Sequence, residues 1–282
     1  MEDAVNLREL VLLLGRHKLL IAATIAVCMI LAIIYVALAR PVYRAEVVLA
    51  AVPQDDAGAG MGALGGQLGG IAALANVSGT GTPSKKDEAV AVLKSRQFTG
   101  AFITEQDLLP VLFAGKWDEQ SATWLGDPPS ISDAVDLFAE EIRSVQQDSK
   151  TELITLRVDW TDRELAAAWA NLLIERLNEY MRGRDIAESK RSIEYLNAEL
   201  ARTNVIELRQ GIFSLIEQQI EVAMLASVRT EYAFRILDPA SVPDEDKFAW
   251  PNSKIIVAVA FALGLLIALL IVTIREYWSD QS

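Results

Sequence analysis

The sequence predicts an α+β protein that two helices hold in a membrane. Two long stretches contain no charged side chain, and the chain between them mixes alternating, strand-like segments with helical ones. Of the 282 residues, 52% are hydrophobic, and that surplus is concentrated in the two stretches. The region between them, residues 40–254, is long enough to form one domain with its own core.

The second uncharged stretch is residues 255–274. As a helix it covers roughly 30 Å, about the thickness of the hydrocarbon core of a bilayer. Lys254 precedes it, and Arg275 and Trp278 follow it; such side chains settle at headgroup depth. We therefore expect a transmembrane helix here, followed by a short tail, residues 275–282.

The first uncharged stretch, residues 19–39, is also long enough to span a bilayer. A cleaved signal peptide is the alternative, because Ala37-Leu38-Ala39 has the small residues of a cleavage site. The apolar run is longer than in a signal peptide, and residues 1–18 before it contain acidic side chains, so we favour an uncleaved anchor. The two tails then lie on one side of the membrane. Basic residues flank the anchors too evenly to indicate which side that is.

Between the anchors, three segments alternate as strands do, and four have helical spacing. The predicted strands are residues 42–52, 153–160 and 232–237. The predicted helices are residues 85–104, a segment capped by Ser132 with Val135, Phe138, Ile142 and Val145 on one face, a long helix at about 162–204, and a return helix at about 205–229. A capping box from Thr161 to Glu164 opens the long helix. The first and last strands each adjoin an anchor, so we expect a small mixed sheet close to the membrane and a long protruding helical hairpin.

A glycine-rich segment, residues 57–81, interrupts this pattern after the first strand. Glycine makes ordered helix or strand costly, which favours a mobile loop. The alternative is a loop that packs closely at a subunit contact.

Composition argues against several classes of function. The net charge of -12 lies mainly in the middle domain and disfavours nucleic acid as a partner. The single histidine, His17, precedes the first anchor, and the single cysteine, Cys28, lies inside it, so the domain has neither a Cys/His pair nor a histidine-based metal site. Residues 79–85 lack the spacing of a phosphate-binding loop. We expect no catalytic residues, no cofactor and no metal, and hence no enzyme.

Two features near the second anchor are candidate sites. Ala260, Gly264 and Ala268 are four residues apart and give the anchor one smooth face, which lets another helix approach closely. We expect this face to pack on the first anchor near Ala22 and Ala26, or on a partner membrane protein.

The other candidate is a proline-rich joint between the last strand and the second anchor. Pro239, Pro243 and Pro251 interrupt regular structure there.

The sequence resembles the chain length determinant (Wzz) family of polysaccharide co-polymerases. The resemblance rests on the order of five segments and their distance from the two anchors. These are PVYRAEVVLA after the first anchor, GALGGQLGGIAAL, DEAVAVLKSRQFTGAFI, DWTDRELAAAWANLLIERLNEYM, and FRILDPASVPDEDKFAWPNSK before the second anchor.

This resemblance implies a bacterial inner-membrane protein with both tails in the cytoplasm and the domain of residues 40–254 in the periplasm. It implies a ring of identical subunits, for example an octamer, that contacts membrane lipid, a Wzy-type polymerase and the growing glycan chain. Such a ring regulates the length of a glycan such as lipopolysaccharide O-antigen and is not an enzyme. An alternative is the adaptor subunit of an exopolysaccharide or capsule export system that works with a separate tyrosine kinase.

Overall fold

The computed structural model describes residues 18–52 and 84–279 and divides into two compact units. One unit comprises Met1–Tyr43 and Asp244–Ser282, and the other Arg44–Pro243. Nearly all of the expected N-terminal tail, the last residues of the C-terminal tail and the glycine-rich segment lie outside the described residues.

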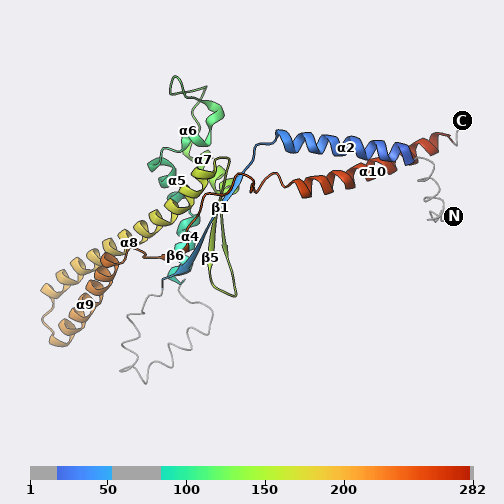
Figure 1. Ribbon diagram of the computed structural model, residues 1–282. Helices are drawn as coiled ribbons and strands as arrows, with labels where there is room; N and C mark the ends of the chain where they lie inside the picture. Colours follow the sequence, from blue (N-terminus) through green and yellow to red (C-terminus); the bar gives the residue numbers. More distant parts are fainter. Residues whose placement is uncertain (1–17, 53–83, 280–282) are drawn as a thin grey trace. The chain divides into compact units, whose positions relative to one another are not determined.

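The first unit contains two long helices, α2 (Lys18–Leu38) and α10 (Ser253–Ser279), which lie side by side (Figure 1). Beyond them, Val42 N donates to Trp250 O at 2.9 Å, and Ala249 N donates to Val42 O at 2.8 Å. The two chain segments are thus joined by main-chain hydrogen bonds where they leave the helix pair.

Three helices of the described residues are long and apolar enough to cross a membrane, whereas we expected two. They are Leu19–Leu38, Ile206–Val228 and Ser253–Ile274, with mean hydropathies of 2.9, 1.2 and 3.3. The additional candidate is the return helix of the hairpin. Its value is lower because Glu217 and Glu221 interrupt its apolar sequence.

The second unit is built on a four-stranded sheet with strand order β4-β5-β1-β6. The strands are β1 (Tyr43–Ala51), β4 (Arg143–Gln147), β5 (Ile154–Trp160) and β6 (Phe234–Asp238). The expected pairing of the first and last strands is present, because β1 is hydrogen-bonded to β6.

The expectation of a mixed sheet is wrong. The β1–β6 and β4–β5 pairs are both antiparallel. Between β1 and β5, Arg44 pairs with Asp159 and Glu46 with Arg157, so residue numbers rise along one strand as they fall along the other. Only antiparallel neighbours give this order. Residues 148–153 join β4 to β5 as a hairpin, a connection too short for parallel strands.

The helices before the sheet also differ from expectation. The predicted helix 85–104 is two helices, α4 (Lys85–Lys94) and α5 (Arg96–Glu105), because Ser95 has an extended backbone and caps α5 by accepting a hydrogen bond from Phe98 N. A short α6 (Leu109–Leu112) follows. The next segment forms a two-stranded hairpin that the sequence did not indicate, β2 (Trp117–Asp118) and β3 (Thr123–Trp124).

Ser130 rather than Ser132 caps the next helix, α7 (Ile131–Leu137), through a reciprocal capping box with Asp133. A π-helix, Phe138–Ile142, follows. Val145 lies in β4 and not on this helix, because strand pairing with β5 overrides the helical spacing.

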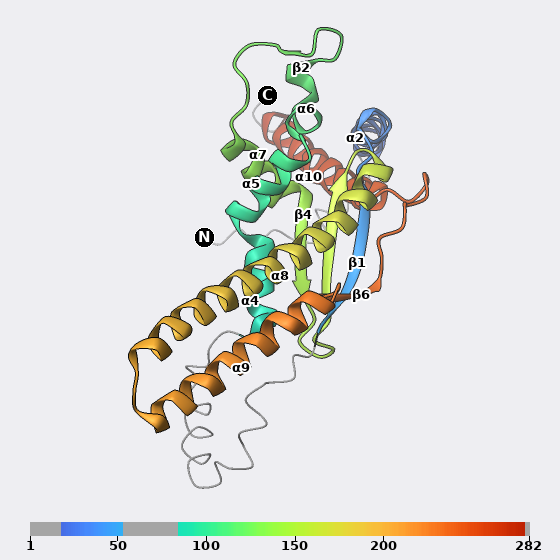
Figure 2. The same ribbon diagram turned by 90° about the vertical axis from the view of Figure 1, so that its left-hand side faces the viewer.

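The helical hairpin consists of α8 (Arg163–Arg202) and α9 (Ile206–Val228), which run side by side in both views (Figures 1 and 2). The cap of α8 is Asp162, not Thr161: its Oδ1 accepts from Glu164 N at 2.8 Å. The inward residues of β1 and β5 and the first half of α8 share one hydrophobic core. That part of α8 therefore covers one face of the sheet.

Candidate functional site

The small-residue face of α10 lies against α2. A Cβ atom added at Gly264 would lie 3.2 Å from Ile25 Cα and 3.2 Å from Cys28 Cβ, so the two backbones approach closely at this glycine. Ala268 is fully buried, and Ala260 is half-buried. The three residues thus share the face that α2 covers.

Ala22 and Ala26 do not take part in this contact, because both are exposed on α2. The helical repeat of about 3.6 residues instead turns Ile25 and Cys28 toward Gly264. Ala32, one turn beyond Cys28, is also buried.

The three prolines lie in different surroundings. Pro239 is exposed, Pro243 is half-buried and Pro251 is buried. The division between the two units falls directly after Pro243.

A set of polar contacts on α8, which sequence reasoning missed, holds the chain segment 232–240. Asn178 is buried and makes three hydrogen bonds to this segment. Its Oδ1 accepts from Ala233 N at 2.8 Å and from Phe234 N at 3.0 Å, and its Nδ2 donates to Phe234 O at 2.9 Å. One amide side chain thus satisfies both main-chain groups of Phe234.

Asn171 repeats this arrangement two turns earlier on α8. Its Nδ2 donates to Ala240 O at 2.9 Å, and its Oδ1 accepts from Ala240 N at 2.9 Å. Asn171 and Asn178 are seven residues apart and so lie on the same face of the helix.

Asp185, seven residues after Asn178, is the third member of the set. Tyr232 Oη donates to its Oδ2 at 2.7 Å in a buried hydrogen bond, and Lys85 Nζ lies 3.0 Å from the same oxygen. Burial raises the pKa of Asp185, but the hydrogen bonds from Tyr232 and Lys85 outweigh it, so that the pKa lies below its ordinary value. The carboxylate is therefore ionised at neutral pH. We call Asn171, Asn178 and Asp185 the polar ladder.

The sequence carries one signal for the polar ladder. Asn171, Asn178 and Asp185 are short polar side chains at intervals of seven, on the helix face that also carries buried Leu177 and Met181. Short polar residues inside a helix are unfavourable unless they have a partner. Their partners are 47 to 100 residues away in sequence, and no local pattern reveals them.

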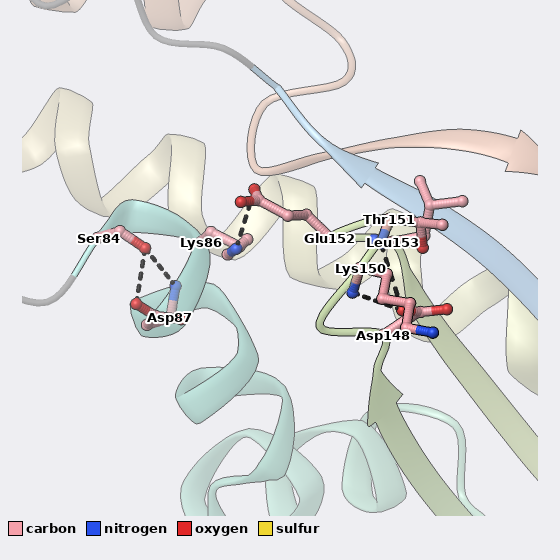
Figure 3. A network of polar contacts seen from close by, with 8 residues as sticks. All are labelled: Ser84, Lys86, Asp87, Asp148, Lys150, Thr151, Glu152 and Leu153. Atoms are coloured by element: carbon pink, nitrogen blue, oxygen red, sulfur yellow. Dashed lines mark hydrogen bonds and ion pairs between the residues drawn. The ribbon is translucent and has the colours of Figure 1, made fainter.

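The start of α4 is tied to the connection between β4 and β5 (Figure 3). Ser84 Oγ caps α4 by accepting from Asp87 N, and Lys86 Nζ lies 3.4 Å from Glu152 Oε2. In the connection, the main-chain N–H groups of Lys150 and Thr151 donate to Asp148 and lower the pKa of its carboxyl group. The first turn of α4 also lines a cavity of about 310 Å³, together with Tyr232 and Met181.

The hairpin exposes a large apolar surface on α9. Only Ile212 and Ala226 of this helix are buried. Four of its large exposed apolar side chains, Ile206, Phe213, Ile220 and Met224, lie on one side of the helix, and Leu208 and Leu215 are exposed on the other side. We call Ile206, Phe213, Ile220 and Met224 the α9 apolar surface. A surface of this kind is typical of a site that contacts another protein or a membrane.

Among the described residues, no three or more His, Cys, Asp or Glu side chains are grouped so that they could hold a metal ion. The fold and these surfaces define a class: α+β proteins with a long helical hairpin, whose domain is preceded and followed in sequence by a helix long enough to span a membrane.

Within this class, residues 3–106 match the family model described as Wzz, chain length determinant protein. This match confirms the resemblance to the Wzz family that the sequence motifs indicated, and it covers the first anchor, β1, α4 and α5. No curated protein matches the sequence.

The solved structures that are similar to the chain include two at low sequence identity. One is described as a full-length bacterial polysaccharide co-polymerase; it is 15% identical, the alignment covers 99% of each chain, and the TM-score is 0.41. The other is a fragment of WzzB, a polysaccharide co-polymerase from Salmonella Typhimurium; it is 11% identical, covers 73% of this chain and 98% of its own, and has a TM-score of 0.28.

Proposed function

We propose that this protein is a polysaccharide co-polymerase of the bacterial inner membrane. It regulates the chain length of a glycan that a Wzy-type polymerase assembles, such as lipopolysaccharide O-antigen, and does not itself catalyse a reaction. The observation that carries the proposal is the match of residues 3–106 to the chain length determinant family.

In this proposal, α2 and α10 cross the inner membrane, both termini are cytoplasmic, and the unit Arg44–Pro243 is periplasmic. The length and hydropathy of the two helices support the spans. The small-residue face at Gly264 holds them together, and the proline-rich joint leads from the domain into α10.

The subunits form a homo-oligomeric ring that serves as a scaffold for the polymerase and the glycan. The α9 apolar surface supports this part of the proposal, because an apolar surface on a protruding helix is costly unless another surface covers it. A neighbouring copy of α9 is the occupant that we propose. The alternative, that α9 lies in lipid, is disfavoured by Glu217 and Glu221 within its apolar sequence.

Deleting the gene and separating the surface glycan of the host cell by gel electrophoresis tests the function. We expect glycan that is still exported but has an altered length distribution, and the wild-type gene should restore the original distribution. Complete loss of surface glycan would instead support the adaptor of an export system with a separate kinase. An unchanged distribution would contradict both functions.

A further inference from the structure

The polar ladder joins α8 to a segment that the sheet also holds. On one side of this segment, Phe234 pairs with Ala51 of β1, and Ala233 O accepts from Val52 N. On the other side, the side chain of Asn178 is hydrogen-bonded to both the N–H and the carbonyl group of Phe234. The segment therefore has a strand along one edge and side chains of α8 along the other.

These side chains replace a neighbouring strand. β6 is an edge strand, and an open edge presents main-chain groups that other chains can pair with. Asn178 and Asn171 each offer one donor and one acceptor to a single residue of the segment, as a paired strand would. Between them, Ile236 N donates to Glu231 Oε1 at 3.1 Å. The outer edge of the segment is thus bonded to side chains at three residues, Phe234, Ile236 and Ala240.

The two ends of the polar ladder contact different parts of the protein. At one end, Asp185 binds Tyr232 and, through Lys85, the first turn of α4. At the other end, Asn171 binds Ala240, three residues before Pro243, where the domain unit ends. As a helix, residues 171–185 span roughly 21 Å. The contacts of the hairpin and the last residues of the domain are thus connected along one helix face.

We propose that the polar ladder is a coupling element. It makes α8 and the segment 232–240 move as one body, so that a displacement of the helical hairpin reaches the residues that lead to the second anchor. Each member is needed because its loss leaves main-chain or side-chain polar groups without a partner, and the freed strand then loosens its neighbours. The coupling itself is a property of the domain and does not depend on the proposed function.

Hydrogen–deuterium exchange of the full-length protein in nanodiscs tests the coupling. The variant Asp185→Asn changes the ladder at one end, and the exchange of Ala240 reports on the other end. We expect peptides that contain Ala240 to exchange about fivefold to tenfold faster in this variant, the effect of losing one hydrogen bond on local opening.

If Asp185→Asn does not fold, the variant Tyr232→Phe is used for the same measurement, because it removes only the hydroxyl group that donates to Asp185. Asn197→Ala, an exposed asparagine on the same helix, is the matched control and should leave the exchange of Ala240 unchanged. Faster exchange confined to residues 232–236 in both ladder variants would overturn the proposal. That result would mean that β1 alone holds the far end of the segment.

Discussion

The two helices of the hairpin are consecutive in sequence and in contact, yet their surroundings differ. Between Ala166 and Ser189, α8 has buried residues throughout and is covered by the sheet and by the segment 232–240. α9 has two buried residues, and most of its large apolar side chains are exposed. The first half of α8 is thus a core helix, whereas α9 carries apolar area that the single chain does not use for its own stability.

The largest effect that separates the two helices should come from equal truncations. Leu177→Ala on α8 removes a fully buried side chain and should lower the free energy of unfolding by about 2–5 kcal/mol. Leu208→Ala on α9, where the side chain is 54% exposed, should change it by less than about 0.5 kcal/mol. Denaturant unfolding of the full chain in detergent measures both. Equal losses would contradict the distinction.

The next effect concerns the membrane helices, which, like α8, are held by close packing. Gly264→Leu places a side chain where even a Cβ atom would lie 3.2 Å from Ile25 Cα and from Cys28 Cβ, so α2 and α10 must separate. We expect a loss of about 1–3 kcal/mol in stability and an altered oligomer mass in nanodiscs. Ala258→Leu, on an exposed face of α10, is the control. If Gly264→Leu leaves unfolding, oligomer mass and glycan length unchanged, this helix contact has no role in assembly.

The difference between these regions also explains what the sequence could predict. Charge-free runs and strict alternation are local signals, and they predicted α2, α10, β1 and β5. Helical spacing, also a local signal, indicated the two helices of the hairpin, and no proline interrupts residues 130–238. Where stability comes from within one element, sequence is informative.

Sequence was less informative where distant segments decide the structure. Val145 has helical spacing but pairs with β5, and Gly264 approaches Cys28 rather than Ala22 because the rotation of α2 depends on its packing. The polar ladder is the clearest case. Its members recur every seven residues, but their partners come from the return of the chain at residues 232–240 and, for Asp185, also from Lys85 at the start of α4.

The charged member of the ladder predicts a pH dependence. The pKa of Asp185 is lower in the folded protein than the ordinary value of 3.8. As the pH falls below 3.8, the unfolded chain therefore binds more protons than the folded protein does. The contribution of this carboxylate is therefore fully present above that value and is lost as the pH falls through the folded pKa. Asp185→Asn should destabilise the protein at pH 7, and the difference from wild type should shrink at acid pH. Asp127→Asn, at an exposed position, is the control, and a difference independent of pH would contradict the ionised ladder.

The smallest effect on stability, and the sharpest test of the comparison, is expected on α9. A triple variant in which Ile206, Phe213 and Met224 are each replaced by serine removes exposed apolar area. It should change the free energy of unfolding of a dissociated subunit by no more than a few tenths of a kcal/mol per site. If a neighbouring subunit covers the α9 apolar surface, the same variant should no longer form the oligomer, because the buried area that drives association is gone.

Mass measurement in nanodiscs gives the oligomeric state, with Gln210→Ser and Gln218→Ser on the same helix as controls. A variant that assembles like wild type would mean that α9 does not form the contact between subunits. The proposed ring would then have to be held by the sheet unit or by α2 and α10.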